Sequence, residues 1–267
     1  MSPPTGTTTR PSPRARPRRI DPRIEARRVE VARSAGRRRL RLLLALLLAS
    51  ALVVDGWLAL HSSWFAVRHV TVLGAGHSTA PAVVAAAGLA NEPPLVDVDP
   101  GAAAAAIERL PWVASATVVR HWPDAVSITV TERVPVGLIA EGHDLAEVDA
   151  TGRVLAVVAR PVPGLVELAA PVHAGPAGSD LGAGAAPALV VAASLPPAFK
   201  AQVAGITVVP GGRVVLTMTT PLKVVLGTTA ELRAKYEDVA AILAGASLHT
   251  GDVIDVSVPQ SPTVTSA

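Results

Sequence analysis

The chain has 267 residues, of which 50% are hydrophobic and 17% charged, and it contains no cysteine. This length allows one large or two small domains, and the lack of cysteine excludes a disulfide framework, a thiolate nucleophile and a cysteine-based metal site. The net charge of +3 conceals an asymmetry, because thirteen arginines and only three acidic residues fall within residues 1–41. The remaining eleven basic and eighteen acidic residues exclude a uniformly basic surface for nucleic acid.

The N-terminal region predicts a tail followed by a membrane anchor. Residues 1–41 are rich in Ser, Thr, Pro and Arg, a composition that cannot bury a core and predicts a disordered basic tail. The apolar stretch that follows predicts a transmembrane helix over residues 42–61. Its interruptions are Ser50, Asp55 and Gly56. Because the arginines precede the span, the positive-inside rule places the N-terminus in the cytoplasm and the rest of the chain outside. The alternative is a signal peptide cleaved near Ala51, where small residues resemble a cleavage site.

The next segment predicts the order strand, helix, helix, strand, strand. Val67–Leu73 alternates as a strand does, and Asp99 before Pro100 predicts the start of the second helix. Two further strands, Val113–Arg120 and Ala125–Arg133, are joined by a short turn. We expect Trp112 to fill the core where the second helix meets the strand. Glu132 and Arg133 are expected to be solvated charges at a strand end.

Residues 136–258 predict short strands with few helices. The Gly/Pro/Ala-rich stretch 170–186 predicts a flexible loop, because no strand enters it and no Gly-Lys-Ser/Thr closes it. Thr228 and Glu231 fit a capping box at the start of a helix. The apolar stripe of that helix is predicted to pack in the core and comprises Leu232, Tyr236, Val239, Ala240 and Leu243. Val253–Val258 predicts the final strand.

No pattern of catalytic or metal-binding residues emerges. The seven histidines are scattered singly, and the sequence has no H-E-x-x-H, G-x-S-x-G or Walker A motif. Four acidic residues cluster along the sequence, but strand ends and turns explain them equally well; they are Glu132, Glu141, Asp144 and Glu147. The sequence therefore predicts a protein that is not an enzyme and that has no cofactor.

Several spaced motifs together carry a family resemblance. The run RLPWVASATVVRHWPDAVSITVTERVPVGLI spans residues 109–139 and follows FAVRHV at residues 65–70. These segments closely resemble the POTRA domain of the FtsQ/DivIB cell-division proteins, and GRVVLTM and VIDVSVPQ resemble the β domain of that family. The predicted fold is α+β: a disordered tail, one transmembrane helix, a βααββ POTRA domain and a mixed β-sheet domain with flanking helices. The two domains are predicted at residues 64–135 and 136–258, with a flexible C-terminal tail at residues 259–267.

The resemblance implies a non-enzymatic scaffold of the bacterial divisome in the inner membrane at the division septum. Such a protein links early and late division proteins and helps to control septal peptidoglycan synthesis. The implied partners are FtsB- and FtsL-like coiled-coil proteins, and the POTRA domain is associated with recruitment. In this family the last strands of the β domain are associated with partner binding by strand addition. The matching candidate residues here are Val256, Val258, Pro259, Gln260 and Ser261.

The strand-addition role has a physical basis, because a terminal strand at Val253–Val258 with only nine residues after it leaves an unpaired edge. Two other classes of function stay open. One is an exported cell-wall enzyme released by cleavage near Ala51. The other is a POTRA-containing secretion or assembly factor, although the sequence shows neither repeated POTRA units nor a long barrel.

Overall fold

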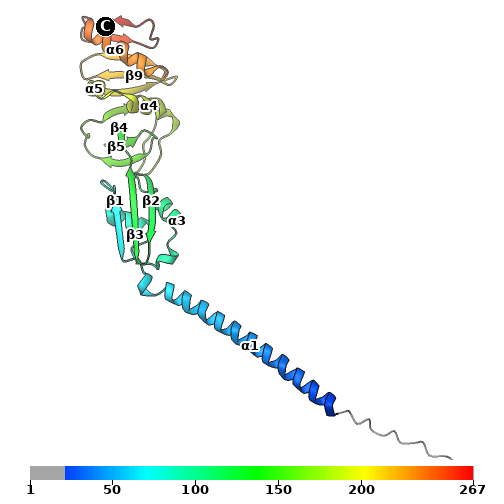
Figure 1. Cartoon of the computed structure of the whole chain (residues 1–267). Coiled ribbons are helices and arrows are strands. Elements are labelled where there is room, and N and C mark those ends of the chain that lie inside the picture. Colours follow the sequence, from blue (N-terminus) through cyan, green and yellow to red (C-terminus); the bar gives the residue numbers. More distant parts are fainter. Residues whose placement is uncertain (1–21, 267) are drawn as a thin grey trace, which may run out of the picture. The chain divides into compact units, whose positions relative to one another are not determined.

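The computed structural model describes residues 22–266, and the chain divides into two compact units, Met1–Ala59 and Leu60–Ala267 (Figure 1). In the first unit the structure describes the helix α1, which extends from Pro22 to Leu60. Its segment Arg38–Leu60 is long and apolar enough to cross a membrane, and it is the one such helix among the described residues.

The helix α1 begins earlier than the sequence predicts. Residues 22–41 were expected within the disordered tail, yet they form the first half of a 39-residue helix. Ala, Arg and Glu are strong helix formers, and no proline follows Pro22 in this stretch, so the helix continues without a break. The predicted disorder of residues 1–21 lies outside the described residues.

The POTRA-like domain confirms the predicted order of elements. Its elements are β1 (His69–Leu73), α2 (Ala80–Ala86), α3 (Pro100–Ile107), β2 (Val113–His121) and β3 (Ala125–Glu132). The sheet has the order β1-β3-β2, in which β3 is parallel to β1 and antiparallel to β2. As predicted, Asp99 caps α3, because its Oδ1 accepts hydrogen bonds from the backbone N–H groups of Gly101 (2.8 Å) and Ala102 (3.2 Å).

The core of this domain lies between one face of the sheet and the two helices. Val126, Ile128 and Val130 alternate along β3 and are buried, as expected for a strand with one covered face. Trp112 does not fill this core, as the sequence predicts it should. It is half-buried and stacks on the ring of His77, with ring centroids 4.0 Å apart, while the neighbouring Val113 takes the buried position.

Glu132 is not the solvated strand-end charge that the sequence predicts. Its carboxylate is only 14% exposed and accepts hydrogen bonds from the backbone N–H groups of Gly76 (2.9 Å), His77 (2.8 Å) and Ser78 (2.8 Å). The His77 ring lies at 3.0 Å from the same carboxylate. Burial alone would raise the pKa of Glu132, but the hydrogen bonds from Ser78, His77 and Gly76 outweigh it and lower the pKa to about 2. Glu132 therefore fixes the loop between β1 and α2.

The second domain is built on one nine-stranded mixed sheet. Its strands are β4 (Pro135–Glu141), β5 (Asp144–Asp149), β6 (Val154–Val158), β7 (Val166–Ala169), β8 (Val203–Val209), β9 (Arg213–Met218), β10 (Lys223–Gly227), β11 (Val253–Asp255) and β12 (Thr263–Thr265). They lie in the order β12-β11-β10-β9-β8-β7-β4-β5-β6, with parallel pairs at β4–β7, β7–β8 and β10–β11. The helices are α4 (Ala186–Ser194), α5 (Pro197–Lys200) and α6 (Leu232–Gly245). This mixed sheet with helices confirms the predicted α+β class.

Two features of this domain differ from the sequence prediction. The helix α4 was missed, although Pro187 in its first turn and a run of apolar residues are signals of a buried helix. The loop 170–186 is not plain flexible chain, because part of it pairs with the edge strand β6. The N–H of Val154 donates to Ser179 O (2.9 Å), and the N–H of Gly178 donates to Val154 O (2.8 Å).

Arg133 links the two folded domains. Arg133 donates from Nε to the backbone oxygen of Val113 (2.9 Å) and from Nη1 to Asp149 Oδ2 (2.7 Å). Burial would raise the pKa of Asp149, but hydrogen bonds from Thr151, Arg133 and Arg153 lower it. Arg133 was predicted to be a solvated charge, and it is instead 19% exposed and ion-paired across the junction.

Candidate partner-binding edge

The C-terminal hairpin forms one edge of the nine-stranded sheet. The strand β11 runs parallel to β10, and the N–H of Val256 donates to Val225 O (3.0 Å) just beyond it. The strand β12 then returns antiparallel to β11, with Ile254 opposite Val264. In the described part of the chain no strand pairs with the outer side of β12. Its outward-facing backbone groups are therefore available to a further strand.

This edge differs from the predicted one. The sequence places the edge at Val253–Val258 and predicts a flexible tail over residues 259–267. The strand is shorter, Val253–Asp255, and the tail contributes β12 at Thr263–Thr265. The returning residues are β-branched, which suits a strand, and their pairing satisfies the backbone groups of β11 that would otherwise stay exposed.

The five predicted site residues lie together in the turn between β11 and β12, but they do not share one environment. Val256 is fully buried in the domain core, so its side chain offers no surface to a partner. Val258 is 55% exposed, Gln260 and Ser261 are exposed, and Pro259 is half-buried. The N–H of Ser261 donates to Val258 O (3.0 Å) and closes the turn.

A buried lysine binds the loop that packs against this hairpin. Lys235 of α6 is 1% exposed, and its Nζ donates to Leu226 O (2.8 Å) and Thr228 O (2.8 Å). Burial lowers its pKa, and the charge of Glu231 only partly opposes this effect. Between the two carbonyls lies Gly227, where a Cβ atom would come within 2.8 Å of the Cβ of Ser257 in the hairpin. The lysine thus holds the loop on which the hairpin rests.

The predicted capping box of α6 is absent. Glu231 occupies the N-cap position with a left-handed backbone (φ 54°), and its side chain makes no capping hydrogen bond. This turn of the chain directs Lys235 towards the loop before the helix, where its ammonium meets the two carbonyls. The lysine therefore binds carbonyl groups of the preceding loop and does not cap the N–H groups at the start of the helix.

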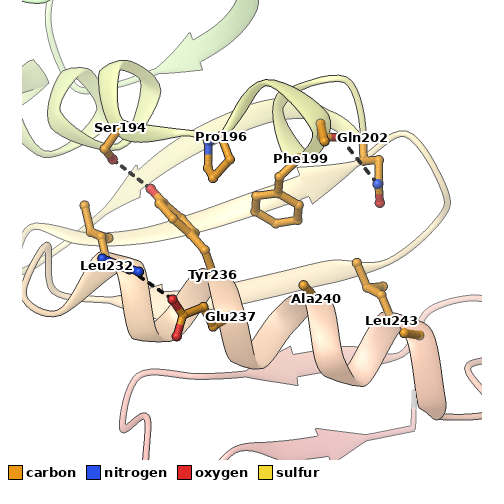
Figure 2. A pocket seen from close by; sticks show the side chains of 12 residues that line it. Ser194, Pro196, Phe199, Gln202, Leu232, Tyr236, Glu237, Ala240 and Leu243 are labelled. Atoms are coloured by element: carbon orange, nitrogen blue, oxygen red, sulfur yellow. Dashed lines mark hydrogen bonds and ion pairs between the residues drawn. The ribbon is translucent and has the colours of Figure 1, made fainter.

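A groove runs between α6 and the segment of α4 and α5 (Figure 2). Its volume is about 810 Å³, and Phe199 and Tyr236 face each other in it with ring centroids 5.7 Å apart. The hydroxyl groups of Tyr236 and Ser194 are hydrogen-bonded at 2.9 Å, and at the rim Arg233 Nε donates to Glu237 Oε1 at 3.0 Å. A mostly apolar groove with such a rim suits an apolar side chain of a ligand or partner.

This groove corrects the interpretation of the apolar stripe on α6. Tyr236 and Val239 are buried, as the prediction of core packing requires. Leu232 and Leu243 are half-buried and pack against the same core, but they also line the groove, as the exposed Ala240 does. The stripe therefore contributes both to the core and to an open surface. Sequence periodicity could not separate these roles, because the helices α4 and α5 that form the opposite wall come from a distant part of the chain.

Two of the four acidic residues that cluster along the sequence bind separate loops. Glu132 binds the loop before α2, whereas Glu141 Oε2 accepts a hydrogen bond from the N–H of Ala174 at 2.9 Å. Among the residues that the structure describes, no group of three His, Asp or Glu side chains could hold a metal ion. What the described surface offers is a strand edge, an exposed turn and an apolar groove.

Comparison with known proteins agrees with this architecture. Residues 65–133 match the model of the FtsQ-type POTRA domain, and residues 137–257 match the model of the FtsQ/DivIB cell division protein C-terminal region. These matches define a class of proteins with a POTRA domain followed by a β domain.

Curated relatives extend the match along the chain. The chain is 31% identical over 239 residues to the cell division protein FtsQ of Streptomyces bingchenggensis, covering 86% of this chain and 89% of the relative. It is 32% identical over 248 residues to that of Streptomyces collinus, covering 86% and 90%. It is also 31% identical over 242 residues to that of Mycobacteroides abscessus, covering 88% and 74%. The chain belongs to the FtsQ/DivIB family of cell division proteins.

Proposed function

We propose that the protein is a non-enzymatic scaffold of the divisome that links early and late division proteins and helps to control septal peptidoglycan synthesis. It acts as a single-pass protein with a cytoplasmic N-terminus and external domains at the septum. Three observations support this proposal. They are membership of the family and, among residues 22–266, one apolar helix long enough to span a membrane and a sheet edge with no neighbouring strand. The main support is the outer edge of β12, because a partner strand can pair with such an edge and this binding mode needs no catalytic group.

The binding mode that we propose is strand addition at β12. A partner segment that pairs with Thr263–Thr265 satisfies outward-facing N–H and C=O groups, and the exposed side chains of Val258, Gln260 and Ser261 contact its flank. Val256 acts indirectly, since it is buried and anchors the turn. The proposed partners are FtsB- and FtsL-like coiled-coil proteins.

The test compares the two edges of the same sheet. Val264 on β12 and Val157 on β6 are 43% and 42% exposed, so they are matched positions on opposite edge strands. A lysine blocks strand pairing at an exposed edge. We expect Val264→Lys to abolish co-purification of the FtsB- and FtsL-like proteins, whereas Val157→Lys leaves it unchanged. Both variants carry a fluorescent fusion before Met1 and replace the native protein in depleted cells.

The outcomes separate binding from targeting. A mid-cell band that survives Val264→Lys while co-purification is lost assigns targeting to the POTRA domain and partner binding to β12. Equal co-purification with both lysine variants contradicts strand addition at β12. Uniform membrane fluorescence of the unmodified fusion with normal septation contradicts the scaffold proposal itself.

A further inference from the structure

The membrane segment of α1 contains one ionisable residue within its apolar part. Between Arg41 and Leu60 the only charged residue is Asp55. It lies five residues before Leu60, or about 7.5 Å along the helix axis from the end of the span. A carboxyl group in such a position is rare in membrane helices and normally faces a partner instead of lipid.

The direction of the side chain prevents Asp55 from escaping to the nearer membrane surface. Helical Cα–Cβ bonds tilt towards the helix N-terminus, so the carboxyl group points away from Leu60 and towards the middle of the apolar segment. Lysine and arginine reach the interface from this depth by extending their long side chains, but aspartate is too short to do so. The carboxyl group therefore needs a polar partner within the membrane.

The helix itself does not supply that partner. Ser50, the other polar side chain of the segment, donates its hydroxyl to Leu47 O at 3.0 Å and is thereby satisfied within the helix. A carboxylate can only accept hydrogen bonds, and at this position the helical N–H groups are already bonded to carbonyls one turn earlier. The hydroxyl of Ser50 therefore needs no partner outside the helix, whereas the carboxyl group of Asp55 needs a hydrogen-bond donor from elsewhere.

The surroundings of Asp55 on the helix surface leave room for a second helix. Ala51 and Ala59 lie four residues before and after it, and residues at this spacing share one face of a helix. Small side chains on both sides of a polar residue allow the backbone of a neighbouring span to approach closely. The three residues form a seam, Ala51–Asp55–Ala59, and each of them is exposed on the helix.

We propose that this seam binds a membrane span of another protein through a Lys or Arg side chain at the depth of Asp55. Charge complementarity selects this occupant, because a cationic side chain both pairs with the carboxylate and provides its missing donors. A second copy of the chain fits worse, since it would place two carboxylates together in a medium of low dielectric constant. This inference rests on the proposed insertion of α1 in the membrane.

The test uses the full chain in vesicles of phosphatidylethanolamine and phosphatidylglycerol. The chain has no cysteine, so one cysteine introduced by Ser2→Cys carries a donor dye without competing sites. The probes are synthetic spans of about 23 leucine and alanine residues, a length that crosses the hydrocarbon core. Each probe carries an acceptor dye and either Lys, Leu or Glu at one position, about one and a half turns from one end. Association is measured by energy transfer.

We expect the unmodified chain to bind the Lys probe about three- to tenfold more tightly than the Leu probe, the range set by polar contacts between membrane helices. Asp55→Leu removes this preference, and Asp55→Lys transfers it to the Glu probe. The control Ser50→Leu keeps the preference of the unmodified chain, because its hydroxyl is satisfied internally.

Equal binding of the Lys and Leu probes by the unmodified chain, or a preference for Lys that persists in Asp55→Leu, overturns the proposal. Extraction by alkaline carbonate identifies which premise has failed. A chain that resists extraction but shows no charge preference refutes the seam alone. A chain that is extracted refutes the membrane insertion on which both this inference and the proposed function depend.

Discussion

Replacement of Glu132 tests how much a single carboxylate contributes to the POTRA domain. Its carboxylate binds four donor groups in a loop that lies more than fifty positions earlier in the sequence, so these contacts link β3 to the start of α2. The lowering of its pKa from 4.5 to about 2 corresponds to about 3 kcal/mol of stabilisation of the folded state. We therefore expect Glu132→Gln to lower the free energy of unfolding at neutral pH by about 2–3 kcal/mol.

The pH dependence of this stabilisation has a definite sign. The pKa is lower in the folded state, so the contribution is fully present above the unfolded value of 4.5 and is lost as the pH falls towards about 2. The unmodified protein should lose stability across this interval, whereas Glu132→Gln should show a flatter dependence there.

The assay is urea unfolding of the full chain in detergent, followed by tryptophan fluorescence. Trp112 reports on this site, because it stacks on His77 with an interplanar angle of 5°. Glu108→Gln is the matched control, since Glu108 accepts a single backbone hydrogen bond, from Ala116 at 3.1 Å. The reasoning is refuted if Glu132→Gln costs no more than the control, or if its stability declines with acid as steeply as that of the unmodified protein.

Three further substitutions test the supports of the fold. Asp149→Asn should lower the free energy of unfolding by about 2–3 kcal/mol, because it leaves Arg133 without its anion. The variant should also lose less stability than the unmodified protein as the pH falls below the ordinary Asp pKa of 3.8. Urea unfolding at several pH values measures both effects. Lys235→Met should cost about 1–3 kcal/mol because two carbonyls lose their donor. Because the pKa of Lys235 is lowered in the folded state, the unmodified protein should gain stability as the pH rises towards 10.5, and Lys235→Met should not. Thermal unfolding measured at several alkaline pH values tests this. The same pH dependence in both proteins contradicts the assignment. Gly74→Ala should cost more than about 2 kcal/mol, since φ is +81° there and a Cβ would overlap the carbonyl oxygen of Val130; an unchanged melting temperature would exclude this contact.

Local signals explain which parts of the fold could be predicted from the sequence. Asp99 before Pro100 marks a helix start through side-chain geometry alone, and the alternation of Val126, Ile128 and Val130 defines the covered face of β3. Such patterns depend on neighbouring residues, so they predict the POTRA elements and their order without knowledge of the tertiary structure.

The candidate site depends on pairing between distant segments, and there prediction was incomplete. The predicted partner-binding residues include Val258, Gln260 and Ser261, which the structure places in an exposed turn, but the sequence does not predict the edge strand itself. Thr263–Thr265 is only three residues long and becomes a strand because β11 offers it unpaired backbone groups. Val256 is buried for a related reason, since the short β11 continues its pairing with β10 by one more hydrogen bond.

The guanidinium of Arg133 lies at the junction between the POTRA domain and the β domain, where a force between the two domains would have to pass. Only Arg133 and Val134 separate β3 from β4, and Arg133 is held by Val113 on one side and Asp149 on the other. No slack chain is available at this junction to absorb a pull. We therefore expect tension applied at the β12 edge to reach the POTRA sheet through the nine-stranded sheet without first extending a linker between the two domains.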